Sequence, residues 1–301
     1  MKQLQVHKWI KWLRKCSLSC LGSFLGSVVF YTSLPLPSSW PLGFERIARW
    51  APVIGCGLGA GLALFDLGLG VLGVPDLTRS LVLVVLWLKL TNGLHLDGAM
   101  DTADGLAVLT PNRRLEVMQD SHTGAFGVMV GGIILLLKMV ALYDLSRGDF
   151  PILWGLVGAA GWGRWGQVCA IAFYPYLKPT GKGAFHKQYL RSPQDVLIGL
   201  FVLLSLGALQ IYLNREKWLG VVISTIAGMG LALFTGWWFN RKLGGHTGDT
   251  YGAVVEWTEA GFLVFLTGIF SFKPCCTGFF RGVAVFTQMP SSLSNLLPNL
   301  F

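Results

Sequence analysis

Long apolar runs separated by short polar stretches dominate the pattern of residues along the chain. The longest are Ala51 to Gly73, Gly127 to Tyr143, Val196 to Leu213 and Trp218 to Phe239. A helix needs about 17 to 25 mostly apolar residues to cross a bilayer, and these runs meet that length or come close to it. The pattern therefore predicts an integral membrane protein rather than a soluble domain.

Hydropathy predicts the fold class as all-α, a polytopic membrane helical bundle. About seven transmembrane helices are expected, at about 50–73, 79–93, 126–144, 153–174, 194–213, 218–239 and 252–271. The apolar segment at 17–31 has half the length of a span, and we expect it to be re-entrant or to lie in the membrane interface. The expected organisation is a basic N-terminal segment (1–16), one membrane-embedded domain (17–271) and a C-terminal tail (272–301).

The distribution of charge refines this picture. The chain is 53% hydrophobic and 13% charged, with a net charge of +9, but no contiguous basic face or nucleic-acid motif accompanies the excess, so no nucleic-acid partner is expected. Three connections, 94–125, 175–193 and 240–251, carry Arg113, Arg114, Lys178, Lys182, Lys187, Arg191, Arg241 and Lys242, whereas the connections between them carry few basic residues. Positive loops stay on the cytoplasmic side, so we expect these three connections together on that face.

Candidate chemistry begins directly after one apolar run. Asp97, Asp101 and Asp104 are spaced i, i+4, i+7, which places three carboxylates on one face if the segment is a helix. Three like charges repel one another, and a hard cation such as Mg²⁺ or Mn²⁺ removes that penalty. The alternative is a solvated acidic face, or carboxylates paired with arginines. Small residues around the carboxylates leave space for a bulky ligand and favour the metal site.

The other polar segments add candidate phosphate contacts. Ser121, Lys178 and Lys182 can supply hydroxyl or cationic groups, and Asp120 is a further carboxylate. The segment 244–253 combines glycines and hydroxyl groups with a carboxylate, as a metal-phosphate cradle would, and its candidate residues are Thr247, Asp249 and Thr250.

Two further residues stand out from their surroundings. Arg164 lies inside an expected span, where a lone cation is costly, so we expect it to contact a substrate phosphate or an acidic partner. Glu256, inside the last span, is expected to pair with Arg164 or with another cation. For His95 a positioning hydrogen bond is the first expectation, with proton acceptance as an alternative.

Three ordered motifs carry a resemblance to a known family. They are G-L-H-L-D-G-x-x-D-T-A-D-G-L at 93–106, R-R-L-E-V-M-x-D-S-x-x-G-x-F-G at 113–127 and G-G-x-T-G-D-T-x-G-A at 244–253. Together they resemble the cobalamin synthase family. The resemblance implies a Mg²⁺-dependent bacterial membrane transferase that joins adenosylcobinamide-GDP to α-ribazole, or to its 5′-phosphate, and releases GMP. Ser33, Gln119 and His122 depart from the family pattern, where basic residues are expected in many members.

The resemblance also implies roles for individual residues. The family's acidic positions fall on Asp97, Asp101, Asp104 and Asp249, which are the expected catalytic and metal-binding residues together with His95 as a catalytic candidate. The expected substrate-binding residues are Arg113, Arg114, Asp120, Ser121, Arg164, Lys178, Lys182, Thr247 and Thr250. The expected location is the bacterial inner membrane, where the protein contacts lipid and its active-site loops face the cytoplasm. A homo-oligomer is possible.

Two other classes of protein fit parts of the sequence. A CDP-alcohol phosphotransferase or an aromatic prenyltransferase also combines a membrane bundle with an acidic metal site, but the order of Asp and Gly differs here. A transporter would place acidic residues along a central path. Here the carboxylates gather at one end of the spans, and no two halves of the chain repeat, so an enzyme is favoured.

Overall fold

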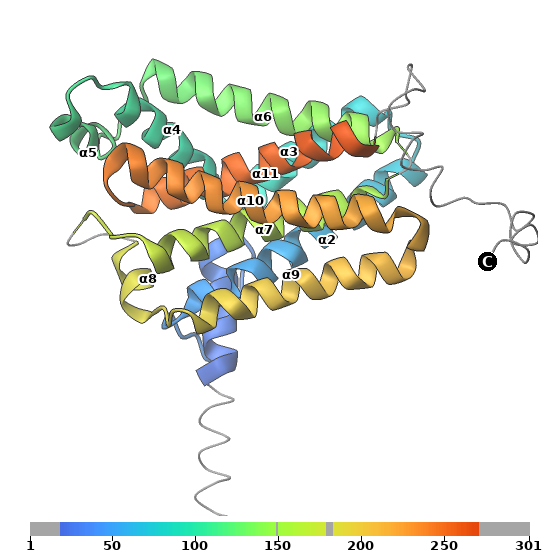
Figure 1. Ribbon diagram of the computed structural model, residues 1–301, viewed down its shortest axis with the longest axis horizontal. Coiled ribbons are helices and arrows are strands. Elements are labelled where there is room, and N and C mark those ends of the chain that lie inside the picture. Colours follow the sequence, from blue (N-terminus) through green and yellow to red (C-terminus); the bar gives the residue numbers. More distant parts are fainter. Residues whose placement is uncertain (1–18, 149, 179–182, 271–301) are drawn as a thin grey trace, which may run out of the picture. The chain divides into compact units, whose positions relative to one another are not determined.

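The computed structural model describes residues 19–148, 150–178 and 183–270, so the expected N-terminal segment, Lys182 and the C-terminal tail lie outside the described residues. The described part is a helical bundle (Figure 1). After an N-terminal helix, Ser19–Tyr31, its helices are α2 (Ala51–Val71), α3 (Asp76–Leu90), α4 (Leu94–Ala107), α5 (Arg114–Val117), α6 (Ala125–Ser146), α7 (Ile152–Phe173), α8 (Ala184–Tyr189), α9 (Gln194–Leu213), α10 (Trp218–Leu243) and α11 (Gly248–Phe270).

Helix α7 is the centre of the bundle and packs against α2, α9, α10 and α11. Small residues make this close approach feasible, as is common between membrane helices. A Cβ atom at Gly59 of α2 would overlap the carbonyl group of Leu156, and one at Gly163 of α7 would lie 2.9 Å from the Val255 carbonyl oxygen of α11. The glycines therefore set the spacing between the central helices.

Fewer helices pass as span candidates than the sequence predicts. Among the described residues, five helices are long and apolar enough to cross a membrane, or up to six if α3 and α4 form one broken span. Helix α7 occupies the expected span at 153–174, but its five glycines, Arg164 and Gln167 make it less apolar than the other long helices. The all-α membrane bundle is confirmed, whereas the count of seven is not.

A sharp break separates α3 from α4. The two helices meet at 89°, and Asn92 and Gly93 between them adopt left-handed backbone angles, with φ of 51° and 66°. Asn and Gly are the residues that reach this region at least cost, so the sequence Thr91-Asn92-Gly93 ends α3 and redirects the chain. As a result α4 packs along α6 and α11 instead of continuing α3.

The N-terminal helix is described over Ser19–Tyr31. The half-span expected at 17–31 begins outside the described residues and stays a prediction. Thr32, directly after it, donates its hydroxyl to the Val28 carbonyl oxygen at 2.6 Å, and the Ser33 amide donates to the Leu90 carbonyl oxygen at 2.7 Å. The end of this helix is therefore tied to the end of α3, next to the break that starts α4.

Candidate functional site

Helix α4 presents the three carboxylates on one face, as their spacing predicts. Asp97 is exposed, and Asp101 and Asp104 are half-buried. The Asp101 carboxyl group lies within electrostatic range of the carboxylates of Asp97, Asp104 and Asp249, with Lys178 as a nearby cation. Carboxylates from α4 and from the start of α11 thus gather around Asp101.

Two glycines bring α4 and α11 into contact at this point. A Cβ atom at Gly98 would lie 2.6 Å from the Asp249 carbonyl oxygen, and one at Gly252 would lie 2.8 Å from the His95 carbonyl oxygen. Both distances are shorter than real Cβ contacts, so only glycine allows the two backbones to approach this closely. This contact brings the Asp249 backbone directly beside α4.

We expect Gly98→Ala to reduce activity by on the order of tenfold to 100-fold, because the added methyl group pushes α11 away from α4 and a misplacement of about 1 Å can cost that much. Steady-state transfer rates of the purified variant test this. Gly132→Ala on α6 is the control, since a Cβ atom there meets open space. Equal activities of the two variants would show that the contact does not set the site's geometry.

Asp249 is held in place by its neighbours at the start of α11. Its Oδ2 atom accepts a hydrogen bond from Lys178 Nζ at 3.0 Å and one from the Thr247 hydroxyl at 3.1 Å. Thr250 donates its amide to Thr247 Oγ1 at 3.3 Å, and Thr247 donates its amide to Thr250 Oγ1 at 2.8 Å. Both threonines are fully buried, so in this structure they cap the helix and orient Asp249 instead of facing solution.

Asp104 also has a structural task. Its two carboxylate oxygens accept the amides of Gly124 at 2.7 Å and Gly127 at 2.8 Å, at the first turn of α6. A carboxylate at a helix N-terminus satisfies free amides and interacts favourably with the helix dipole. Asp104 therefore fixes α6 to α4, which separates it in role from Asp97 and Asp101.

The remaining candidates of the segment 108–124 lie around the edge of the site. Arg114 donates to the carbonyl oxygens of Val108 at 3.1 Å and Lys242 at 3.0 Å, which ties this segment to the end of α10. Arg113 and Ser121 are exposed. Asp120 is exposed too, and a hydrogen bond from the His122 backbone amide, with a second from its ring, lowers the pKa of this carboxyl group.

The connections at 175–193 and 240–251 are joined by backbone hydrogen bonds. The Leu177 amide donates to the His246 carbonyl oxygen at 2.8 Å, and the His246 amide donates to the Pro175 carbonyl oxygen at 2.9 Å. Burial lowers the pKa of His246 to about 4, so its ring is neutral at pH 7. One ring nitrogen lies 3.1 Å from the Gly236 carbonyl oxygen and the other 3.0 Å from Thr250 Oγ1, which fixes the orientation of the ring.

All three polar connections therefore lie at one end of the bundle, the end at which α5 and α8 are found on opposite sides (Figure 1). The expectation that they share one end is confirmed by the pairing of Lys178 with Asp249 and of Arg114 with the Lys242 backbone. Which side of the membrane this end faces remains a prediction.

His95 and Arg164 lie deeper than the carboxylates. His95 is 2% exposed, stacks 6.3 Å from the Tyr31 ring, and its Nε2 atom has no hydrogen-bond partner among the described residues. Arg164 is fully buried, and its Nη1 atom lies 2.7 Å from Glu259 Oε1. Of the two contacts expected for Arg164, the structure contains the acidic partner.

Lys138, the centre of that buried network, is not among the residues that the sequence motifs single out. Lys138 of α6 lies 2.6 Å from both Glu256 and Glu259 of α11, so Glu256 pairs with Lys138 and not with Arg164. The available signal was a single lysine inside the apolar run 127–143 and a second carboxylate three residues after Glu256. All four side chains are buried.

The carboxylate face suits a cation that takes part of its ligands from a substrate. Within the described part of the chain, no group of three or more His, Cys, Asp or Glu side chains is close enough to hold a metal ion by itself. Mg²⁺ is commonly bound by one or two carboxylates together with waters and substrate phosphates. The half-buried Asp101 and the exposed Asp97 fit that donor set, whereas Asp104 and Asp249 already have protein partners.

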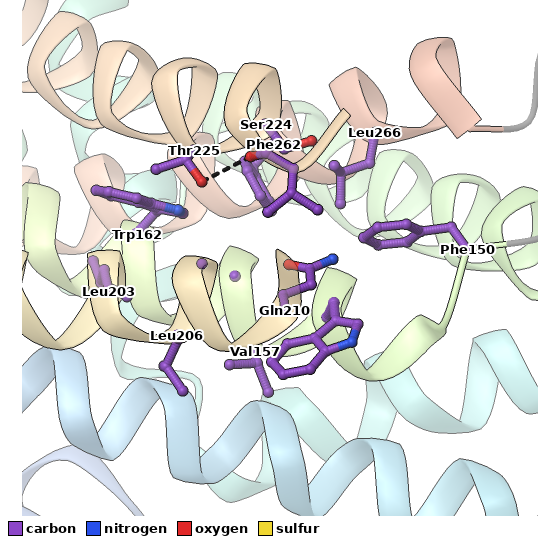
Figure 2. Close-up of a pocket in the computed structure, with 14 residues that line it drawn as sticks. Phe150, Val157, Trp162, Leu203, Leu206, Gln210, Ser224, Thr225, Phe262 and Leu266 are labelled. Atoms are coloured by element: carbon purple, nitrogen blue, oxygen red, sulfur yellow. Dashed lines mark hydrogen bonds between the residues drawn. The ribbon is translucent and has the colours of Figure 1, made fainter. Parts of the chain in front are cut away.

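A small pocket lies elsewhere in the bundle, between α7, α9, α10 and α11 (Figure 2). It has a volume of about 40 Å³ and contains Gln210, Ser224 and Thr225 among mainly apolar neighbours. That space suits a few water molecules, not a nucleotide. No candidate site residue lines it, so it is separate from the carboxylate face.

The fold and this face together define a polytopic membrane protein with an acidic site at one end of its bundle. Comparison with known families makes the assignment specific, since the model of the cobalamin-5-phosphate synthase family matches residues 23–267. The chain belongs to this family. The resemblance seen in the three motifs is thereby confirmed.

Several relatives share most of their length with the chain. The adenosylcobinamide-GDP ribazoletransferase of Trichormus variabilis is 55% identical over 247 residues, which is 82% of this chain and 97% of the relative. The protein of the same name from Synechocystis is 48% identical over 86% of this chain and 99% of the relative. The one from Thermosynechococcus vestitus is 49% identical over 81% of this chain and 95% of the relative. No solved structure matches the chain.

Proposed function

We propose that the chain joins adenosylcobinamide-GDP to α-ribazole, or to its 5′-phosphate, and releases GMP, a step of cobalamin synthesis. Family membership over residues 23–267 supports this assignment. The observation that carries it is the gathering of Asp97, Asp101 and Asp249 beside Lys178 at the end of the bundle. The alternatives of a transporter, a CDP-alcohol phosphotransferase or a prenyltransferase receive no support from the family match.

The chemistry requires the negative charge of a diphosphate to be neutralised while a new phosphate ester forms. A free ribose hydroxyl group of α-ribazole, or of its 5′-phosphate, attacks the phosphorus next to the cobinamide, and the bond from that phosphorus to the bridging oxygen breaks, so GMP leaves. Positioning and electrostatic stabilisation supply most of the catalysis in such transfers. Mg²⁺, when bound, neutralises charge on the diphosphate oxygens. Asp97 and Asp101 are the residues proposed to hold it, with Asp249 adjoining them.

Other residues of the site position the substrate and neutralise its charge in this proposal. Lys178 pairs with Asp249 and can turn its ammonium group toward a phosphate that enters beside it. The proton of the attacking hydroxyl group passes to a carboxylate of the α4 face in this proposal. His95 is less suited to that step because it is 2% exposed.

The direct test is release of GMP by the purified full-length protein supplied with adenosylcobinamide-GDP, α-ribazole and Mg²⁺. We expect GMP to form only when both organic substrates are present, and EDTA to stop it. Omission of α-ribazole distinguishes transfer from simple hydrolysis. GMP release that is independent of α-ribazole would contradict the proposed transfer, and an active enzyme in EDTA would contradict the metal.

The active-site end of the bundle is proposed to face the cytoplasm of a bacterial inner membrane. We expect single cysteines at Ser121 and Lys242, both exposed at this end, to react with impermeant maleimide only from the cytoplasmic side. Thr247, although in the same region, is fully buried and unsuited to labelling. A cysteine at Glu216, exposed between α9 and α10, is the control for the opposite side. The six native cysteines are replaced by serine in this background. Labelling of Ser121 and Lys242 from different sides would refute the topology.

A further inference from the structure

A large apolar groove lies behind the carboxylate face. It has a volume of about 420 Å³ and is bounded by α4, α6, α10 and α11. Helix α4 contributes Ala99, Thr102, Ala103 and Leu106. At 100° per residue these positions lie on the side of the helix opposite to the three aspartates. One short helix therefore separates an acidic surface from an apolar hollow.

The groove opens between α6 and α10, which both pack against α11 but make no extensive contact with each other within these two fully described helices. Its lining includes Phe234, Trp238, Phe239 and Trp257, and Phe234 is 54% exposed. An apolar hollow of this size does not hold water favourably, and its volume lies in the range of about 300 to 1,000 Å³ that ligand sites have. Because α6 and α10 are membrane-spanning candidates, the groove faces hydrocarbon.

Cationic groups stand at the end of the groove nearest the polar connections. The Lys242 Nζ atom lies 5.6 Å from the centre of the Trp238 ring, which itself lines the groove, and the Arg241 guanidinium lies 5.7 Å from the Trp237 ring. Both basic side chains are exposed. Tryptophans with Lys and Arg at a helix end mark the level of lipid headgroups, and such cations attract anionic lipids.

We propose that this groove binds an acyl chain of an anionic phospholipid, whose headgroup phosphate lies against Lys242 and Arg241. The apolar lining accepts the chain and the two cations select the headgroup. A bound chain also supports the back of α4, the helix that carries the carboxylates. The proposal stands on the geometry of the groove and does not depend on the proposed reaction.

Native mass spectrometry tests both the acyl-chain site and the headgroup preference. The full-length protein is delipidated and then supplied with phosphatidylglycerol or phosphatidylcholine of the same acyl chains. We expect one tightly held phosphatidylglycerol in the parent and its loss in Gly261→Phe. A Cβ atom at Gly261 makes only ordinary contact, 3.6 Å from Leu231, so the larger ring fills the groove. Gly268→Phe is the matched control, because this glycine lies on the same helix in open space. Retention of the lipid in Gly261→Phe would overturn the site.

The headgroup assignment has its own comparison. We expect Lys242→Gln to lower the preference for phosphatidylglycerol over phosphatidylcholine by about tenfold, the effect of losing about 1.4 kcal/mol. Arg215→Gln should leave it unchanged, since Arg215 stacks on Tyr212, 5.8 Å from its ring, outside the groove. Equal retention of both lipids by the parent would contradict the preference for an anionic headgroup. A dimer without bound lipid would show that a second copy of the chain, not a lipid, occupies the groove.

A measurement that leaves the groove unfilled covers the case in which Gly261→Phe does not fold. Phosphatidylglycerol with brominated chains quenches tryptophan fluorescence on contact. We expect the quenched fraction to fall in Trp257→Phe, which removes a ring from the groove lining, and not to fall in Trp40→Phe, where the exposed indole lies outside it. An equal quenched fraction in the parent and in Trp257→Phe would contradict an acyl chain in the groove.

Discussion

Asp101→Asn is expected to lower the rate of GMP release by on the order of 100-fold or more while leaving the protein folded. Asn keeps the size of the side chain and one oxygen but removes the charge that a hard cation requires. The Asp101 carboxyl group is already surrounded by other carboxylates, so removing its charge relieves repulsion in the absence of metal. Stability should therefore stay equal or rise slightly as activity falls.

This opposite behaviour of activity and stability separates a metal site from a solvated acidic face. Transfer rates across a Mg²⁺ titration, combined with thermal unfolding in detergent, measure both properties. The double variant Asp97→Asn/Asp101→Asn should lose little more than Asp101→Asn alone, because the cation is already weakly held. Activity within twofold of the parent for Asp101→Asn at limiting Mg²⁺ would refute the proposed site.

Asp104→Asn provides an internal contrast. Its two oxygens accept amides at the start of α6, and Asn can offer only one oxygen to those two donors. Loss of a helix cap costs about 0.5 to 2 kcal/mol, so this variant should lose thermal stability as well as activity. Equal unfolding temperatures for Asp104→Asn and Asp101→Asn would show that the contacts of Asp104 with Gly124 and Gly127 contribute little.

The sequence predicts local features of the site well because they depend on spacing along one helix. The i, i+4, i+7 order of Asp97, Asp101 and Asp104 defines a face wherever the segment is helical, and α4 is helical over Leu94–Ala107. Asn92 and Gly93 likewise signal the end of α3. The division of tasks among the carboxylates was not predictable, since the partners of Asp104 are 20 and 23 residues away.

Long-range pairing is the part that the sequence does not determine. Glu256 was expected to meet Arg164 or another cation, and the fold supplies Lys138, 118 residues away. Such a pairing depends on which helices pack together and on their rotation. The count of seven spans is unconfirmed for a related reason: α7 is surrounded by other helices, so it needs less apolar surface than a helix that faces lipid.

Removal of Lys138 is expected to have the largest effect on stability. Its ammonium group lies 2.6 Å from Glu256 and from Glu259 and 4.5 Å from the Trp87 ring centre, and Arg164 completes the network through Glu259. The two cations balance the two carboxylates. In Lys138→Met one buried carboxylate loses its partner, and breaking a buried pair in this way costs about 3–5 kcal/mol.

Restoring the balance of charge should recover part of that loss. In the double variant Lys138→Met/Glu256→Gln, Arg164 and Glu259 remain as a neutral pair, so its unfolding temperature in detergent should exceed that of Lys138→Met. Lys89→Met on α3 is the control for loss of an exposed lysine, and such surface changes usually stay within about 0.5 kcal/mol. If Lys138→Met unfolded at the same temperature as Lys89→Met, or if the double variant were the least stable of the three, the network would not be a balanced buried unit.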